Sequence, residues 1–309
     1  AFFLRIAGIS YGLPMWLVSD EPPFIYGALK MLELRTLVPA LHTADFAAGL
    51  YFPPYLSYIY LPFFIPILGT KFLFFSGTLR QFVDFVTLDP SALFLAGRMV
   101  SALLGTATVW LVYKTAKRIF VSEPPALLSS AFLALSFLHV NFSHWARHWV
   151  PATFFFALVM YILSRGDLSV RKRYLLASLV AGIGVGINYQ AGLSALFIGL
   201  WFLFYDKVLD SSVRWNDRWI LGCVLLFAAL VALAYGLYPG GLVVHGANVV
   251  GGGKSIIGFF RGYGFYAQKL VETEPSFFAF IIAGFVALFF RARRYFWTAS
   301  LFTFAYIAV

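Results

Sequence analysis

Charge is scarce in this sequence. Only 12% of its 309 residues are charged, whereas about 25% is usual for a soluble domain. Hydrophobic residues make up 61% of the chain, aromatic residues 20%, and the mean hydropathy is +0.84. This composition excludes an ordinary soluble domain and indicates an integral membrane protein.

Cysteine is nearly absent, and acidic residues are few. The single Cys223 lies inside an apolar run and excludes a disulfide framework. The 13 acidic residues are outnumbered by 23 basic ones, which gives a net charge of +10. A basic balance can indicate a nucleic-acid partner, but here the cations lie in short loops between apolar runs, so orientation in the membrane explains them better. The sequence also has no equally spaced repeats and no low-complexity linker. We therefore expect residues 1–309 to form a single membrane domain.

What the chain does contain is a series of apolar stretches of roughly 17–25 residues, the length of a membrane-spanning helix. They predict an all-α polytopic membrane protein with a helical bundle, because a membrane barrel would need alternating strands. Four basic loops separate the later stretches, at 114–118, 165–173, 206–218 and 291–294. Two apolar runs fit between each successive pair, so all four loops can lie in the cytoplasm. The count gives about nine spans.

The apolar segment 51–69 does not fit this series. It carries Pro53, Pro54, Pro62 and Pro66, and each proline removes a backbone donor and disfavours an uninterrupted helix. We expect a re-entrant or interfacial element here; the alternative is a complete span with residues 71–86 returning as a second, shorter one. In both cases residues 19–91 cross the membrane an even number of times, so the end of the first apolar run, 2–18, lies on the outer side.

With this number of crossings, residues 19–91 and 239–276 are two large loops on the outer side. Residues 24–38 have amphipathic helical spacing and are expected to lie along the membrane surface. The sequence begins with Ala1 and stops at Val309 within an apolar run, so we expect a fragment of a longer polytopic protein.

Two of the few acids are adjacent in "LVSDEPPF". Asp20 and Glu21 follow the first apolar run and precede Pro22 and Pro23, which favour an extended chain. A carboxylate at this place can accept a proton from an attacking hydroxyl, and apolar surroundings raise its basicity. The alternative is a pair of solvated acids at a helix end.

A glycine-rich segment, "GGGKS", covers residues 251–255. A nucleotide-binding loop would need a glycine where the chain has Asn248, and a buried strand before it. A loop whose amides approach a phosphate from the outer side, together with Lys254, Arg261 and Lys269, is the functional interpretation. The alternative is an ordinary surface loop.

Histidines gather in the segment "HVNFSHWARHWV". His144 and His148 would share one face of a helix, with His139 nearby. This spacing allows a metal, but interfacial histidines more often form hydrogen bonds, and no carboxylate is close in sequence. Residues 141–143 also match a glycosylation sequon, a motif with many false positives.

Arg98 lies in or at the start of the apolar run "FLAGRMVSALLG". An ionisable side chain at this depth indicates a polar contact with a functional or structural role. Asp20 or a ligand phosphate is the expected partner, and snorkelling to the interface is the alternative.

Six segments in this order resemble the GT-C glycosyltransferases that use polyprenyl-phosphate sugars. These segments are "LRIAGISYGLP", "SDEP", "YFPPYLSYIY", "AGRMVSALLGTATVWLVYKTAKRIF", "SHWARHWVPATFFFAL" and "AGIGVGINYQAGL". The nearest groups are the protein O-mannosyltransferases and their bacterial relatives, which include the lipid A aminoarabinose transferases. The resemblance covers most of the chain.

The resemblance implies a multi-pass enzyme of the plasma (inner) membrane that transfers a sugar, with inversion, from a polyprenyl-phosphate carrier to an acceptor protein, lipid or glycan on the extracytoplasmic side. The family's catalytic acid maps onto Asp20, with Glu21 beside it. Candidate contacts to the donor phosphate are Lys254, Arg261, Lys269 and Arg98. Candidate contacts to the sugar or acceptor are Tyr51, His144, Trp145, Arg147, His148 and Trp149. No cofactor is required, and a divalent metal is allowed but not needed.

Two departures from the family pattern weaken this transfer. Relatives often carry a second acid where this chain has Trp149 and Val150, so His148 or Arg147 would take that role, or the acceptor geometry differs. Relatives also often place a lysine near the position of Gln190. A transporter or lipid flippase and a non-catalytic homologue therefore stay as alternatives, although a transporter commonly shows internal repeats.

Overall fold

The computed structural model describes residues 1–14, 21–46, 52–206, 218–240, 256–291 and 293–308, and every regular element in these ranges is a helix. The N-terminal part contains α1 (Phe2–Ile6), α2 (Pro22–Glu33), the 3-10 turn η1 (Pro39–His42), α3 (Thr43–Phe46), α4 (Tyr55–Leu73) and α5 (Leu79–Leu88). The middle part contains α6 (Ser91–Phe120), α7 (Glu123–Leu135), α8 (Phe137–Ser143), α9 (Trp149–Leu163), α10 (Val170–Val185) and the 3-10 turn η2 (Tyr189–Gly192). The C-terminal part contains α11 (Leu193–Trp201), the π-helical turn η3 (Phe202–Asp206), α13 (Arg218–Leu237), α15 (Ile256–Thr273), α16 (Pro275–Arg291) and α17 (Arg293–Ala308). The expected all-α polytopic class is confirmed.

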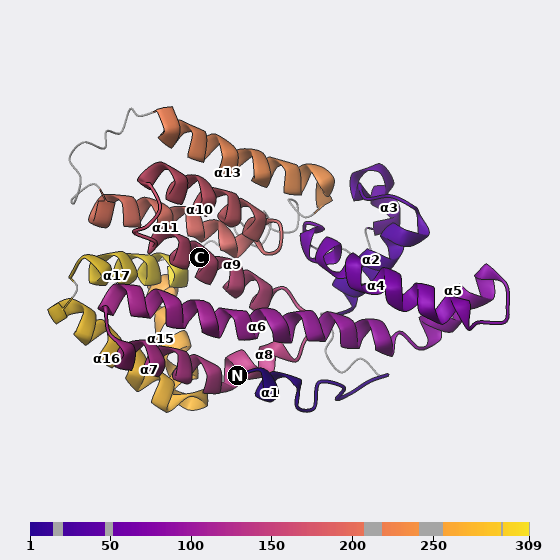
Figure 1. Cartoon of the computed structure of the whole chain (residues 1–309), viewed down its shortest axis with the longest axis horizontal. Helices are drawn as coiled ribbons and strands as arrows, with labels where there is room; N and C mark the ends of the chain where they lie inside the picture. The colour runs from indigo at the N-terminus through magenta and orange to yellow at the C-terminus, as the bar shows by residue number, and fades with distance from the viewer. Residues whose placement is uncertain (15–20, 47–51, 207–217, 241–255, 292, 309) are drawn as a thin grey trace.

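Helix α6 is the central element, with 30 residues. It begins after Pro90 and ends where Val121 adopts a left-handed φ of 51°. Lys117 and Arg118 occupy its last turn, where cations interact favourably with the helix dipole. Helices α7 and α9 pack along α6, α10 packs on α9, and α13 packs on α10, so these long helices lie side by side (Figure 1).

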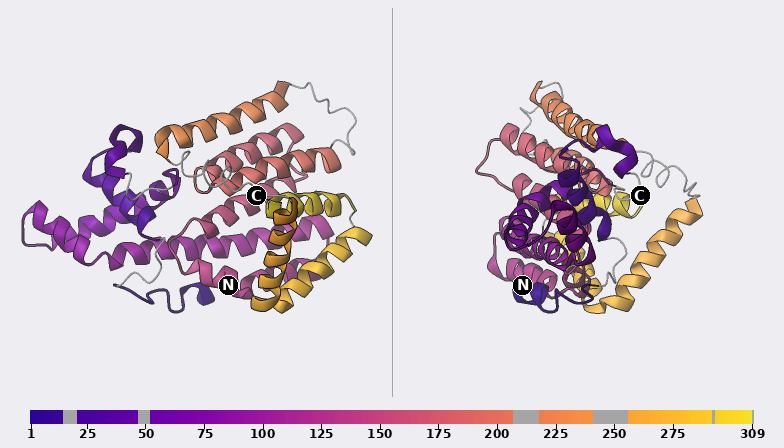
Figure 2. Two further views of the ribbon diagram at one scale, coloured as in Figure 1. Left: turned by 180° about the vertical axis from the view of Figure 1, so that it is seen from behind. Right: turned by 90° about the vertical axis from the view of Figure 1, so that its right-hand side faces the viewer.

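The remaining helices gather at opposite ends of α6. Helices α2–α5 surround its N-terminal end, whereas α15–α17 lie toward its C-terminal end, as Figure 1 and the left view of Figure 2 show. Helix α16 is attached to α7 by Phe132 and Phe280, whose rings stack with centroids 4.0 Å apart. The bundle therefore carries a separate helical group at each end.

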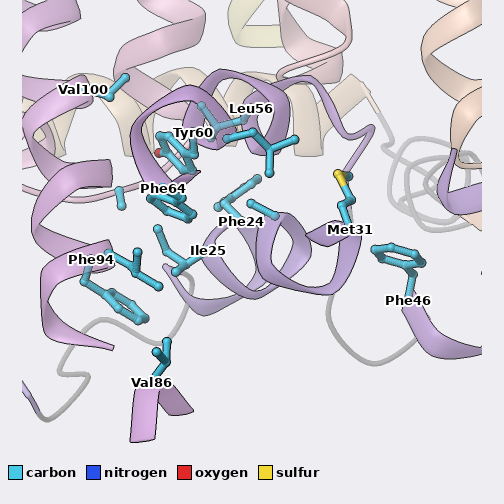
Figure 3. Close-up of a cluster of buried hydrophobic side chains, with 14 of the residues drawn as sticks. Phe24, Ile25, Met31, Phe46, Leu56, Tyr60, Phe64, Val86, Phe94 and Val100 are labelled. Carbon is cyan, nitrogen blue, oxygen red and sulfur yellow. The ribbon is translucent and has the colours of Figure 1, made fainter. Parts of the chain in front are cut away.

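The group at the N-terminal end of α6 has its own apolar core (Figure 3). Phe24 and Met31 from α2 meet Tyr60 and Phe64 from α4, and all four side chains are buried. Phe94 closes the cluster from α6. The hydroxyl of Ser57 also donates to the carbonyl oxygen of Phe24 over 3.0 Å, which joins α2 to α4. Burial of each such side chain contributes about 1.5–3 kcal/mol, so this part of the expected first outer loop is a packed layer of helices.

Helix α4 corrects the expectation that prolines interrupt residues 51–69. It runs without a break from Tyr55 to Leu73 with Pro62 and Pro66 inside it. Packing of its buried face against α2 and α6 keeps the helix continuous despite the missing backbone donors. The alternative in which residues 71–86 return as a span is also wrong, because α4 continues to Leu73 and α5 has only 10 residues. The re-entrant or interfacial placement expected for residues 51–69 stays a prediction, although α4 is long and apolar enough to cross a membrane.

The expected first span, 2–18, is wrong for its described part. Helix α1 ends at Ile6, and the chain then turns at Gly8 and Gly12, whose φ values of 76° and 81° are left-handed. Helix α2 confirms amphipathic helix within 24–38, but it ends at Glu33 because Arg35 takes a left-handed φ of 51°. Its position along the membrane surface stays a prediction.

Three described helices are long and apolar enough to cross a membrane, namely α4, α6 and α13. The pair α7 and α8, bent by 57°, would be a fourth span. Two shorter apolar helices, α9 and Phe278–Phe290, coincide with the expected spans 150–164 and 277–290. The number of nine spans and the two outer loops remain predictions.

Candidate functional site

Glu21 lies at the N-terminal end of α2, and its carboxylate is fully buried. Its Oε1 accepts hydrogen bonds from Arg98 Nε at 2.9 Å and from the backbone N–H of Ala146 at 2.7 Å. Its Oε2 accepts a third from Arg98 Nη2 at 2.7 Å. A bidentate pair of this kind is among the strongest hydrogen-bonded contacts in proteins. The acid next to Asp20 is therefore rigidly held.

Arg98 comes from the second turn of α6 and is 2% exposed. Its Nη1 donates to the carbonyl oxygens of Ile9 at 2.8 Å and Tyr11 at 2.9 Å. Arg98 thus joins α6, the turn after α1 and the start of α2, while Glu21 adds the corner between α8 and α9 through Ala146. The sequence predicted Asp20 or a ligand phosphate as the partner of Arg98; the structure pairs it with Glu21.

Small residues allow these segments to meet. Gly97 precedes Arg98, and a Cβ at this position would lie 2.8 Å from Ile25 Cδ1 and 2.9 Å from Ala146 Cβ. Such distances are closer than packed carbon atoms tolerate. The backbone of α6 therefore approaches α2 and Ala146 closely enough for the ion pair to form only because residue 97 is a glycine.

A cavity of about 420 Å³ opens beside this pair. Arg98 forms part of its wall, so the polar network and the cavity are directly connected. The other lining residues come from the turn after α1 and from α8 and its C-terminal corner: Ala7, Gly8, Ile9, Tyr11, Asn141, His144 and Trp145. The volume falls within the 300–1,000 Å³ range of small-molecule sites.

His144 and His148 do not share a helix face, which corrects that expectation. Helix α8 ends at Ser143 and α9 begins at Trp149, so both histidines lie in the corner between them. The Nε2 of His144 lies 3.0 Å from the carbonyl oxygen of Ala7. The ring of His148 instead packs on Phe52, with centroids 4.3 Å apart. Among the described residues, no group of three His, Cys, Asp or Glu side chains is arranged to hold a metal.

Aromatic side chains cover the same corner. The Arg147 guanidinium lies 3.6 Å from the centroid of the Trp149 ring, a close cation–π contact. Trp145 and Trp149 both pack against Phe142, at centroid distances of 5.4 Å and 4.5 Å. Of the expected sugar or acceptor contacts, Trp145 and His144 line the cavity, whereas Arg147 and Trp149 stack on each other beside it.

The other predicted site residues are not brought to the cavity by described contacts. Asp20, Tyr51 and Lys254 lie outside the described residues, and Arg261 belongs to α15 without a described side chain. Lys269 is exposed on α15 and pairs with Glu272 of the same helix at 2.8 Å. Their roles toward the donor phosphate stay predictions.

A buried arginine in α1 escaped the sequence analysis. Arg5 is fully buried, and its Nη2 donates to His139 Nδ1 at 2.7 Å. It also donates to the carbonyl oxygens of Leu133 and Ala134 at 3.2 and 3.3 Å, where α7 gives way to α8. An arginine inside the apolar run "AFFLRIAGIS" was a detectable signal, because such residues form polar contacts.

A second buried ion pair lies at the other end of the bundle. Arg173 Nη2 lies 2.7 Å from Asp206 Oδ1, and the two side chains are 7% and 6% exposed. The Tyr174 hydroxyl donates to Asp206 Oδ2 at 2.6 Å, and Arg173 Nη1 donates to the carbonyl oxygen of Leu163 at 2.9 Å. Asp206 belongs to the π-helical turn η3. Turns of this kind are frequent at functional sites.

Residues 90–235 match the sequence profile of the dolichyl-phosphate-mannose-protein mannosyltransferase family. This match confirms the resemblance to the GT-C glycosyltransferases and supports, in general, a glycosyltransferase that depends on a polyprenyl-phosphate sugar. It includes Arg98, the α8–α9 corner and the Arg173–Asp206 pair. Neither a curated protein nor a solved structure matches the chain.

Proposed function

From the family match over residues 90–235, we propose that this protein is an inverting glycosyltransferase. It moves a sugar, such as mannose, from a polyprenyl-phosphate carrier to a hydroxyl group of an acceptor on the extracytoplasmic side of the plasma (inner) membrane. One observation carries the proposal. The buried Glu21–Arg98 pair fixes the chain next to Asp20, and Arg98 of this pair lines a cavity of ligand size.

Asp20 is the catalytic base in this proposal. Its carboxylate accepts the proton of the acceptor hydroxyl as that oxygen attacks the anomeric carbon of the sugar. The bond from the anomeric carbon to the phosphate oxygen breaks on the opposite face, and the polyprenyl phosphate leaves with the electron pair. One displacement inverts the anomeric centre, and the scheme needs no cofactor or metal.

The leaving phosphate needs cations, since its negative charge grows as the bond breaks. Lys254, Arg261 and Lys269 are assigned to this role because Lys254 lies in the glycine-rich segment of the later outer loop and the other two follow it. Tyr51, Trp145 and Trp149 supply aromatic surface for the substrates, and His148 or Arg147 stands in for the second acid that relatives carry.

Glu21 and Arg98 are positioning residues instead of a base and a phosphate ligand. Both oxygen atoms of Glu21 already accept hydrogen bonds from Arg98, and the carboxylate is fully buried. Arg98 already uses Nε, Nη1 and Nη2 in contacts to protein. Their shared role is to hold the turn after α1, the start of α2 and Ala146 together around the cavity.

The charge distribution along α6 supports the proposed orientation. The end of α6 away from Arg98 carries Lys114, Lys117 and Arg118. Arg118 contacts Asp167 at 3.2 Å in the basic loop between α9 and α10. Clustered cations are typical of cytoplasmic loops. The Glu21–Arg98 end therefore belongs to the extracytoplasmic side.

The test uses purified full-length protein, a panel of polyprenyl-phosphate sugars including the mannose derivative, and detection of released polyprenyl phosphate. Asp20→Asn is compared with Asp45→Asn, which removes an exposed acid from α3 in the same outer loop. We expect turnover to fall at least about 100-fold for Asp20→Asn and to stay near the unsubstituted level for Asp45→Asn. Equal activity of the two variants would overturn the role of Asp20 as the base, whereas no turnover with any donor would favour a non-catalytic homologue.

A further inference from the structure

One wall of the cavity beside Arg98 is backbone that is already fixed. The carbonyl oxygen of Ala7 faces His144 Nε2, while those of Ile9 and Tyr11 accept hydrogen bonds from Arg98. Backbone hydrogen bonds from Ile9 to Ile6 and from Tyr11 to Gly8 close successive turns in this segment. A wall held at so many points needs little reordering when a ligand binds.

Gly8 keeps this wall free of side chains. Its φ of +76° is a conformation that residues with a Cβ seldom adopt, and a Cβ built there meets no atom within 4 Å. The position therefore combines a required glycine with open space in front of it. A ligand can approach the backbone of the turn closely.

The opposite wall offers neutral polar groups and an aromatic ring. Since a carbonyl oxygen cannot donate, the hydrogen between His144 and Ala7 belongs to His144 Nε2, and Nδ1 is the ring nitrogen that this contact leaves open. Asn141 contributes a side-chain amide that no hydrogen bond engages within the described residues. Trp145 lies next along the wall. Donor, acceptor and aromatic surface together suit a ring that carries several hydroxyl groups.

Arg98 is the one lysine or arginine among the described residues that line the cavity, and its charge is neutralised. The charge of Arg98 is balanced by Glu21 at 2.7 Å, and three of its nitrogen atoms already donate to protein oxygens. A phosphate would find little unbalanced positive charge here, because recognition of phosphate relies on free Arg or Lys groups. The cavity is thus suited to the neutral part of a lipid-linked sugar.

We propose that this cavity binds the sugar ring of the donor and that Asn141 is a specificity-determining residue that hydrogen-bonds the ring hydroxyls. The inference rests on the proposed glycosyltransferase function and adds the place of the sugar. It also gives a role to Asn141 of the sequon at 141–143, which lines the cavity. Ser143 of the same sequon is buried and donates to the carbonyl oxygen of His139 at 2.6 Å within α8.

The direct test is cysteine protection, which the chain makes simple because Cys223 is its one cysteine and is buried. Asn141→Cys is made in a Cys223→Ala background of the full-length protein, and its alkylation rate is measured in detergent. The matched control is Thr43→Cys, an exposed position in α3 away from the cavity. The probes are a short-chain prenyl-phosphate mannose, the same prenyl phosphate without sugar, and methyl mannoside.

We expect the sugar-bearing prenyl phosphate, at about ten times its Kd, to slow alkylation of Asn141→Cys about tenfold, since the free fraction of the site falls in that proportion. The sugar-free prenyl phosphate leaves the rate unchanged, and Thr43→Cys reacts equally in all cases. Methyl mannoside carries the same ring without the carrier, so it should slow alkylation only at millimolar concentration. Protection by the sugar-free phosphate would place the carrier in the cavity and overturn the proposal.

A second measurement separates this inference from the proposed function. Asn141→Leu should raise the KM for the sugar donor about tenfold, the loss expected when a hydrogen bond to a hydroxyl is removed. Phe137→Leu, an exposed change on the same helix, should leave the KM unchanged. An Asn141→Cys thiol that the donor does not protect, together with an unchanged KM in a protein that does transfer sugar, would overturn the cavity assignment and leave the function intact. A chain that releases no carrier phosphate from any donor would overturn both.

Discussion

The two buried ion pairs of this protein solve the same physical problem at opposite ends of α6. Moving a charged pair out of water is costly, and the cost is recovered only when the remaining polar atoms are also paired. Glu21–Arg98 achieves this with three backbone groups, from Ile9, Tyr11 and Ala146. Arg173–Asp206 does so less completely: it uses the Tyr174 hydroxyl and the carbonyl oxygen of Leu163, while Arg173 Nε is buried without a hydrogen-bond partner.

The pairs differ in what they connect. Arg98 reaches Glu21 across 77 positions of the sequence, and Glu21 reaches Ala146 across 125. Arg173 reaches Asp206 across only 33 positions, among packed rings such as Trp201 and Tyr205. The first pair therefore assembles distant segments around a cavity, whereas the second stabilises neighbouring helices. A buried ion pair is informative about function mainly through the segments it brings together.

The largest expected effect comes from Arg98→Met, which leaves the Glu21 carboxylate buried without its partner. An uncompensated buried charge costs about 3–5 kcal/mol, so the detergent-purified variant should unfold at a much lower temperature and lose sugar transfer. Adding Glu21→Gln should recover part of the stability, because no bare charge remains. Sugar transfer should stay low in the double variant, since the Glu21–Arg98 ion pair no longer holds α6, the turn after α1 and the start of α2 together. A double variant as active as the parent would contradict the positioning role.

Arg173→Met should destabilise the protein by a similar or slightly smaller amount, about 3 kcal/mol, for the same reason. Its transfer rate per folded molecule should nevertheless stay within about twofold of the parent, because the pair lies at the end of the bundle away from the cavity. The measurement is turnover normalised to the folded fraction from thermal unfolding. Loss of transfer in a fully folded sample would show that the two ends are coupled.

Gly97→Ala tests how closely the segments at the first pair must approach. The added Cβ meets Ile25 and Ala146 at under 3 Å, and overpacking of this kind costs about 1–3 kcal/mol. We expect a lower unfolding temperature together with reduced transfer. Gly199→Ala is the matched control, because a Cβ at this position of α11 meets no atom within 4 Å and alanine favours a helix.

The smallest effect is expected for Asp167→Asn, which removes an ion pair from the surface. The Arg165 guanidinium holds the pKa of Asp167 below its usual range, with Arg118 adding to the effect. Since the folded-state pKa is depressed, any stabilisation is present at neutral pH and is lost as the pH falls below about 4. Exposed pairs contribute little. The unfolding temperatures of Asp167→Asn and the parent should nearly coincide at pH 7; a large gap would mean that this pair is less screened than its exposure implies.

Much of the fold was predictable from the sequence. The apolar stretches predicted the helices α6, α7, α9, α10 and α13, because length and hydropathy alone identify segments that suit a bilayer. The predictions failed at glycine and proline residues, because their effect on the backbone depends on the surrounding structure. Gly8 and Gly12 turn the first apolar run, while α4 stays helical through Pro62 and Pro66 because its neighbours hold it.

The site was predictable only in part. Arg98 and Glu21 were recognised as polar residues of interest, since charges beside apolar runs are rare and conspicuous. Their pairing was not, because it depends on contacts between segments 77 positions apart. Asn141 was noted only as part of a sequon, and nothing in its local sequence indicates that the turn after α1 would lie opposite it. Arg173 and Asp206 were treated as ordinary loop charges.

The length of α6 makes the protein sensitive to bilayer thickness. Its 30 residues rise about 45 Å, and the 20 residues from Arg98 to Arg118 rise about 30 Å, the depth of a typical hydrocarbon core. In a thinner bilayer the helix must tilt to keep its apolar length within the hydrocarbon core. Tilting would displace Arg98 and its hydrogen bonds relative to the helices α2 and α4, which pack beside α6. Lipid acyl-chain length should therefore tune the catalytic rate without any change of sequence.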